Sequence, residues 1–119
     1  MTDMNCFIKD AIRTESVRVH PVPPRVEHAA YGCVTESAEL LDALKKAKFY
    51  GKTLDLTNIK EEAGDLLWYL AILFDELDTS FEQEAGRVIA KLKARYPDKF
   101  TLQLAENRDL KKEREILEK

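Results

Sequence analysis

KEEAGDLLWYLAILF, residues 60–74, is the stretch that decides the fold of this chain. Its last nine residues carry no charge, which is typical of a helix that is buried on nearly all sides. Glu62 and Asp65 lie one turn before that run, on a surface that should continue into the interior. Burying an unpaired charge is costly, so acids in this position need a compensating partner. The stretch therefore predicts a core helix that carries two carboxylates inward.

The rest of the chain is typical of an all-α protein. Only four of its 119 residues are glycine and four are proline, and strand-like alternation is almost absent. We expect one domain over residues 1–119. Within it we predict an N-terminal helix and a Pro-rich linker (1–24), core helices separated near 51–56 and 78–80 (25–96), and a C-terminal helix or frayed arm (97–119).

Charge and cysteine content narrow the class of protein. The net charge of −3, from 19 basic and 22 acidic side chains, argues against broad nucleic-acid binding. The apolar run is half the length of a membrane span, and the N-terminus does not resemble a signal peptide. Cys6 and Cys33 form no CxxC pair, which favours two free thiols in a reducing compartment. We expect a cytoplasmic protein that binds neither nucleic acid nor membrane.

A second pair of acids lies on the preceding helix. Glu36 and Glu39 in TESAELLDALKK are three residues apart, as are Glu62 and Asp65, so each pair shares one helix face. The short connection near residues 51–56 predicts an antiparallel hairpin, in which the two pairs can face each other. Converging oxygen ligands favour a hard cation such as Mg²⁺ or Mn²⁺. The alternative is a solvated helix face on which nearby lysines pair with these acids.

In their context, these acids resemble the ExxE…ExxD signature of the MazG-like, all-α nucleoside triphosphate pyrophosphohydrolases. HAAYGCVTESAELLDALKK is similar to the first motif helix of that family, and IKEEAGDLLWYLA is similar to the second. KLKARYPDKF and NRDLKKE resemble the C-terminal part of one subgroup, so the similarity covers roughly residues 25–115. Val88 departs from the pattern, because many relatives are expected to carry Asn at this position.

The resemblance implies a reaction and a set of site residues. The implied reaction is Mg²⁺-dependent hydrolysis of a nucleoside or deoxynucleoside triphosphate to the monophosphate and pyrophosphate, as part of nucleotide-pool housecleaning. Glu36, Glu39, Glu62 and Asp65 are the expected metal ligands, with Mn²⁺ as a possible substitute ion. Glu36 or Glu39 is the expected catalytic base, and the sequence leaves that choice open. The alternative function is a catalytically silent helical module that binds nucleotide or a partner protein.

The chain is also expected to oligomerise. A short helical hairpin cannot cover both sides of the apolar run by itself, so other subunits should help to bury it. Trp68 belongs either to the core or to such an interface. The resemblance likewise implies a homodimer or homotetramer, in which a MazG-like four-helix bundle is completed between chains.

Five further residues are candidates for substrate contact. Lys91 and Arg95 lie on a basic stripe of the fourth predicted helix and suit phosphate groups, although such a stripe also complements a helix dipole. Tyr69 follows the second acid pair by one turn, where it either stacks on the nucleotide or packs in the core. His28 lines the base pocket or lies on the surface at the helix start. Asn107 reaches a base or ribose if the tail folds over the site.

Overall fold

Every regular element of this computed structural model, which describes residues 3–119, is a helix. No strand occurs within that range, and the predicted all-α class is confirmed. The helices are α1 (Met4–Ile12), α2 (Pro24–Tyr50), α3 (Leu56–Glu76), α4 (Phe81–Arg95), α5 (Leu102–Glu106) and α6 (Leu110–Leu117).

Local sequence signals set the ends of the two long helices. Pro24 occupies the first turn of α2, where its missing N–H costs nothing. Gly51 ends α2 in the left-handed region, with a φ of 68° that suits a residue without a Cβ. Asp55 caps α3, because its Oδ1 accepts hydrogen bonds from the N–H groups of Thr57 (3.0 Å) and Asn58 (3.2 Å). These caps leave only a short connection between α2 and α3, as predicted.

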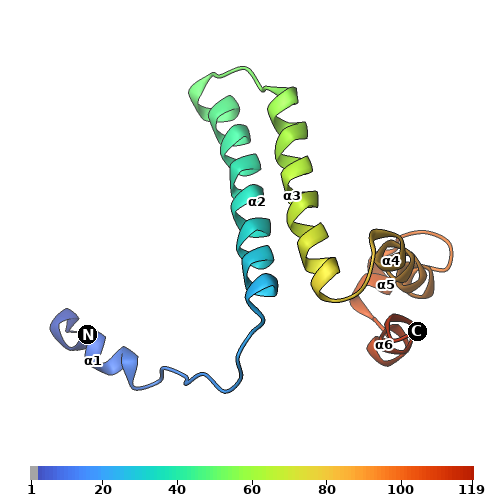
Figure 1. Cartoon of the computed structure of the whole chain (residues 1–119), viewed down its shortest axis with the longest axis horizontal. Helices are drawn as coiled ribbons and strands as arrows, with labels where there is room; N and C mark the ends of the chain where they lie inside the picture. The colour runs from blue at the N-terminus through green and yellow to red at the C-terminus, as the bar shows by residue number, and fades with distance from the viewer. Residues whose placement is uncertain (1–2) are drawn as a thin grey trace.

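The helices α2 and α3 form an antiparallel hairpin (Figure 1). A close approach between them lies at Gly32, where a Cβ would be 2.1 Å from the ring atom Cδ1 of Tyr69. The Tyr69 ring therefore packs directly on the backbone of α2. Edge-to-face contacts with His28 (5.7 Å between ring centroids) and Trp68 (5.1 Å) hold the ring on two further sides. Nearby Ala29 is fully buried.

A second helix pair, α4 with α6, is held by a buried ion-pair network. Glu113 on α6 is only 4% exposed and accepts hydrogen bonds from Nε of Arg95 (3.0 Å) and Nε of Arg108 (3.1 Å). Hydrogen bonds from Arg108, which has the larger effect, and from Arg95 lower the pKa of Glu113 below its ordinary value. The C-terminal segment is thus folded back onto α4 and is not a frayed arm.

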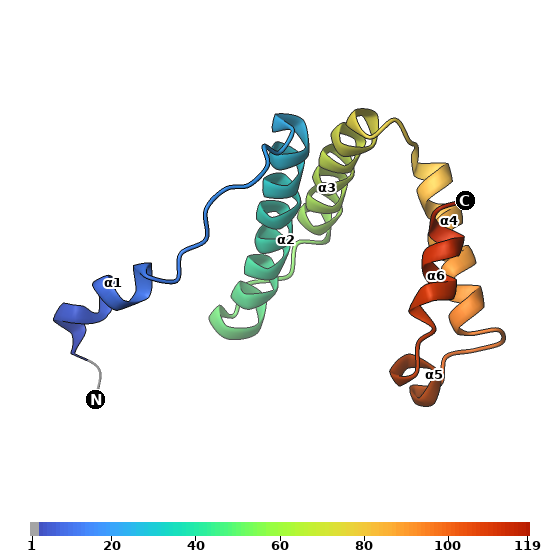
Figure 2. The ribbon, with the colours of Figure 1, turned by 90° about the horizontal axis from the view of Figure 1, so that it is seen from below.

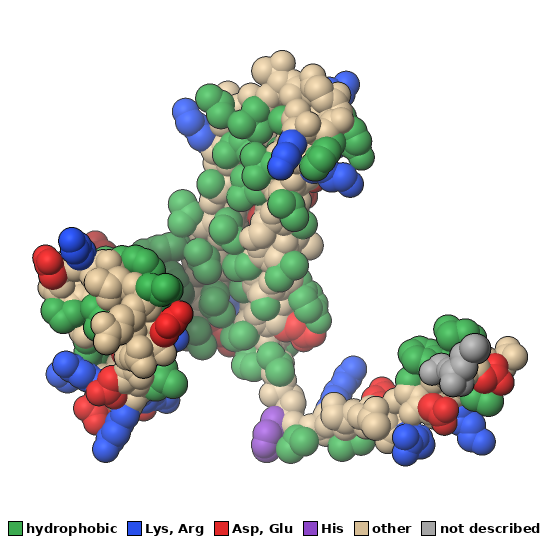
Figure 3. All heavy atoms as spheres, turned by 180° about the vertical axis from the view of Figure 1, so that it is seen from behind, with side chains coloured by type: hydrophobic (Ala, Val, Ile, Leu, Met, Phe, Trp, Pro, Cys, Tyr) green, Lys and Arg blue, Asp and Glu red, His purple; other side chains and the backbone are tan. Residues whose placement is uncertain are grey.

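The single chain is open (Figures 1 and 2), with α1 at the end of an extended linker and α4–α6 beside the hairpin. Its radius of gyration is 20.4 Å, whereas a compact domain of this length would have about 13–14 Å. Ala29 is the one apolar residue fully buried among those described. Apolar side chains are visible over much of the hairpin surface (Figure 3). The chain alone therefore forms two helix pairs and does not close a four-helix bundle.

Two further features concern the cysteines and the length of the apolar helices. Cys6 and Cys33 are free thiols, as predicted. Within residues 3–119, no helix combines the length and the apolar character that crossing a membrane requires.

Candidate metal centre

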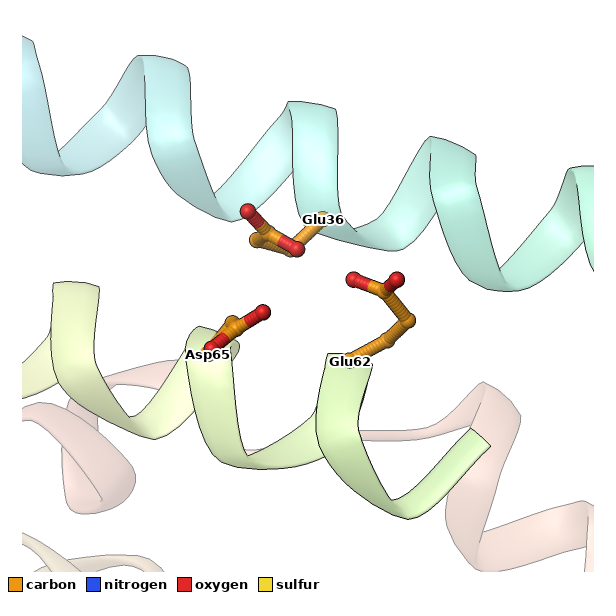
Figure 4. A group of neighbouring side chains, drawn as sticks. All are labelled: Glu36, Glu62 and Asp65. Atoms are coloured by element: carbon orange, nitrogen blue, oxygen red, sulfur yellow. The ribbon is translucent and has the colours of Figure 1, made fainter. Parts of the chain in front are cut away.

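Three of the predicted acids converge at the middle of the hairpin. Glu36 comes from α2, and Glu62 and Asp65 come from the facing turns of α3. One carboxylate oxygen from each lies within 4.8 Å of the others, and the three side chains point toward one another (Figure 4). The convergence follows from the three-residue spacing on each helix together with the antiparallel hairpin. This is the arrangement that the two sequence motifs predicted.

The centre of this group is buried, and no basic side chain among the described residues neutralises it. Glu62 is 7% exposed, and Oε2 of Glu62 and Oε2 of Glu36 are buried without any hydrogen-bond partner. The neighbouring carboxyl of Glu36 raises the pKa of Glu62 above its ordinary value, and burial adds to that rise. The nearby Lys46 pairs with Asp42 (2.9 Å) and not with these acids. The buried carboxylate of Glu62 does not fit the solvated-face alternative, whereas Glu39 and Asp65 are exposed.

Glu39 occupies the rim of the same centre. It is exposed, and it lines a pocket together with Glu62 on the side toward the hairpin loop. A hydrogen bond with Glu62, followed by charge repulsion from the same carboxylate, raises the pKa of Glu39 above its ordinary value. Of the four predicted acids, three therefore form the cluster and the fourth stands beside it.

The donor set fits a divalent metal ion. Carboxylate oxygens are the preferred ligands of hard cations such as Mg²⁺ and Mn²⁺. Buried carboxylate oxygens without a partner are rare in native proteins, and a bound ion is one of the features that account for them. A cation bound here would satisfy the unpaired oxygens of Glu36 and Glu62 and would screen their mutual repulsion.

Comparison with known protein families agrees with this geometry. Residues 26–100, more than half of the chain, match the family described as MazG nucleotide pyrophosphohydrolase domain. The chain belongs to the MazG family. The matched MazG region contains nearly all of α2 and the whole of α3 and α4, and with them all four acids, whereas α1, α5 and α6 lie outside it. No curated protein and no solved structure matches the chain significantly.

Two of the predicted substrate residues lie beside the acids of this MazG hairpin. Tyr69 follows Asp65 by one turn of α3, and the ring of His28 meets the Tyr69 ring edge to face. Together they form an aromatic group on the side of the acids that faces away from the hairpin loop.

The other three predicted substrate residues lie on the separate α4–α6 part of the chain (Figure 2). Arg95 is engaged by the buried carboxylate of Glu113. Lys91 lies half-buried on the same helix, α4. The side-chain N–H of Asn107 donates to the carbonyl of Gln103 at 2.8 Å. The structure does not bring these residues to the acids of the same chain.

Sequence reasoning missed two features of the site. The first is Gly32, whose lack of a side chain lets Tyr69 approach α2. The second is the loop-end pocket, which two lysines line, Lys46 and Lys52. The position of Lys46, seven residues after Glu39 on the same face of α2, is a signal that could have revealed it.

The raised pKa values predict how stability depends on pH. A group whose pKa is raised on folding contributes stability below its unfolded pKa, and this contribution is lost as pH rises through the folded value. For Glu62, the pH range over which this stability is lost begins near its ordinary pKa of 4.5 and extends to higher pH. In EDTA, wild type should therefore be less stable than Glu62→Gln near neutral pH, and the gap should narrow as pH falls toward about 5. Calorimetric Tm values across pH test this, and a pH-independent gap would contradict it.

Proposed function

We propose that this chain is a Mg²⁺-dependent pyrophosphohydrolase that cleaves nucleoside or deoxynucleoside triphosphates to the monophosphate and pyrophosphate. The observation that carries the proposal is the cluster of Glu36, Glu62 and Asp65 in a MazG-family hairpin, in which one oxygen of Glu36 and one of Glu62 are buried without a partner. A triphosphate is highly anionic, so an acidic site can accept it only with a cation between them. The free thiols of Cys6 and Cys33 support a reducing, cytoplasmic setting.

The acids divide into two proposed roles. Glu36, Glu62 and Asp65 would hold the divalent ion, which when bound stabilises charge on the phosphoryl oxygens and favours deprotonation of water. Glu39 stands beside this cluster and is open to solvent. A carboxylate that stands outside the three proposed ligands and is open to solvent can accept a proton from water. This supports Glu39 over Glu36 as the general base, with Glu39 also close enough to the cluster to contribute to the metal site.

The aromatic group would receive the nucleobase. His28 is exposed and Tyr69 is half-buried beside it, so a base placed next to the acids would contact the His28 ring and the part of the Tyr69 ring that α2 leaves uncovered. Lys91, Arg95 and Asn107 remain candidates for substrate contact only if they reach the site from a second chain. Arg95 is the weakest of the three, because Glu113 already neutralises it.

We also propose that the chain works as a homodimer or homotetramer. Leu67 and Trp68, inside the apolar run of α3, are 55% and 56% exposed in the single chain. A monomer rarely exposes apolar surface on this scale, and a second hairpin packed on it would complete a four-helix bundle.

Light scattering should show an oligomer, and Leu67→Lys should shift it toward monomer. Val17→Lys in the exposed linker is the control, and a wild-type monomer at micromolar concentration would contradict the proposal.

The function is tested by assaying a panel of ribo- and deoxyribonucleoside triphosphates with Mg²⁺ and with EDTA, detecting pyrophosphate and orthophosphate separately. We expect pyrophosphate and monophosphate with Mg²⁺, no product in EDTA, and a loss of about 100-fold or more in Glu39→Gln. Orthophosphate with a nucleoside diphosphate would contradict the proposed bond cleavage. Absence of turnover on every base, with Mg²⁺-dependent stabilisation intact, would favour the silent nucleotide-binding module.

A further inference from the structure

A pocket of about 320 Å³ opens at the loop end of the α2–α3 hairpin. It adjoins the metal centre, because Glu39 and Glu62 line its inner end. The outer end is built from the last turns of α2, the connecting loop and the start of α3. Two lysines, Lys46 on α2 and Lys52 in the loop, line this part together with Asp42 and Asp55.

The charge of this pocket changes along its length. Lys46 lies seven residues after Glu39 on the same helix face, which places the two Cα atoms about 10 Å apart along the axis. Nζ of Lys46 is 2.9 Å from Oδ2 of Asp42, so its charge is partly neutralised. Lys52 forms no ion pair with any described residue, and it lies in the loop that closes the outer end of the pocket. The inner end is thus negative. Asp55 also lines the outer end, where Oδ1 of its carboxylate accepts hydrogen bonds from the N–H groups of Thr57 and Asn58, and Lys52 supplies the available positive charge.

The order of groups along the hairpin also gives the site a direction. The aromatic pair His28 and Tyr69 lies on one side of the acids, and the lysine pocket lies on the other. A metal-bound nucleotide placed on the acids would have an aromatic surface at one end and ammonium groups at the other. The base suits the first environment and the terminal phosphates suit the second.

We propose that Lys52, assisted by Lys46, binds the β- and γ-phosphates of the substrate and holds the pyrophosphate that leaves. The inference rests on the proposed pyrophosphohydrolase function, and it extends that function by naming the pocket for the leaving group and the orientation of the nucleotide. The ligand chemistry is a metal-bound diphosphate group. An ammonium at this position would also offset negative charge that builds up on the leaving group as the bond breaks.

The test is titration calorimetry of inorganic pyrophosphate into the full-length protein with Mg²⁺ present. We expect wild type to bind and Lys52→Gln to bind about 10- to 100-fold more weakly, as for the loss of a charged hydrogen bond. Lys48→Gln is the matched control, because it removes the same charge from the same hairpin outside the pocket lining. Both lysines lie at the surface of the hairpin, so neither variant should unfold the protein. A nucleoside monophosphate should bind all three proteins equally.

Each outcome separates this proposal from the function on which it rests. Failure of wild type to bind pyrophosphate, or equal weakening in Lys48→Gln and Lys52→Gln, would overturn the pocket assignment. Normal turnover in Lys52→Gln with unchanged pyrophosphate affinity would also overturn it, while leaving the pyrophosphohydrolase function in place. Lys52-dependent pyrophosphate binding without wild-type turnover would support the pocket and contradict hydrolysis.

Discussion

Glu62→Gln is expected to lower kcat/KM by on the order of a thousandfold and to remove the increase in Tm that Mg²⁺ gives to wild type. Glutamine keeps the shape of the side chain but removes the charge at the centre of the acid cluster. In EDTA the same variant should be more stable than wild type, because Glu36 no longer faces a second buried carboxylate. Kinetics with a responsive substrate and melting curves with Mg²⁺ or EDTA provide both measurements.

The informative result is the combination of lost activity and gained metal-free stability. A residue with a purely structural role would lose stability together with activity. Glu61→Gln is the matched control, because Glu61 is the exposed neighbour of Glu62 on α3 and lies outside the cluster. If Glu62→Gln kept its Mg²⁺-dependent rise in Tm, Glu62 would not be a ligand of the ion.

Gly32→Ala is expected to destabilise the protein by about 1–3 kcal/mol, the typical effect of inserting a methyl group into a packed contact. The added Cβ would lie 2.1 Å from Cδ1 of Tyr69, so either the ring or one of the helices must move. Movement of α2 away from α3 would also separate Glu36 from Glu62. We therefore expect activity to fall by about 100-fold, as is typical of a displacement of about 1 Å in a catalytic site.

The control for this variant is Gly86→Ala on α4, where an added Cβ meets no atom within 4 Å. Alanine favours helix over glycine by about 0.5–1 kcal/mol, so this change should leave stability unchanged or raise it. Combining Gly32→Ala with Tyr69→Ala removes the clashing ring and should restore the Mg²⁺-dependent rise in Tm. Equal stability of Gly32→Ala and Gly86→Ala in thermal melts would show that the contact is not tight.

Features that depend on neighbouring residues were predictable from the sequence. Pro24, Gly51 and Asp55 each fix a helix end by a local rule about backbone conformation or capping, and the structure has them in those roles. The facing acid pairs were also predictable, because helix periodicity and a short connection determine which side chains meet across a hairpin.

Features that depend on tertiary packing were not predictable. Nothing in the spacing of Gly32 and Tyr69 indicates that they touch, because their contact depends on the axial offset of α2 and α3. The pairing of Arg95 with Glu113 depends on how the chain turns back after Pro97, which the sequence does not reveal. From the sequence alone, Arg95 therefore looked free to bind phosphate. The apolar run of α3 indicated a buried helix, but a single chain leaves much of it exposed.

The most direct test of the metal centre is anomalous X-ray scattering from crystals of the protein grown with Mn²⁺. We expect a peak between the carboxylates of Glu36, Glu62 and Asp65, at the point where their oxygens already converge. We also expect the peak to disappear in Glu62→Gln. Mn²⁺ bound elsewhere, or a cluster that stays empty at a metal concentration that supports turnover, would contradict a metal centre at these acids.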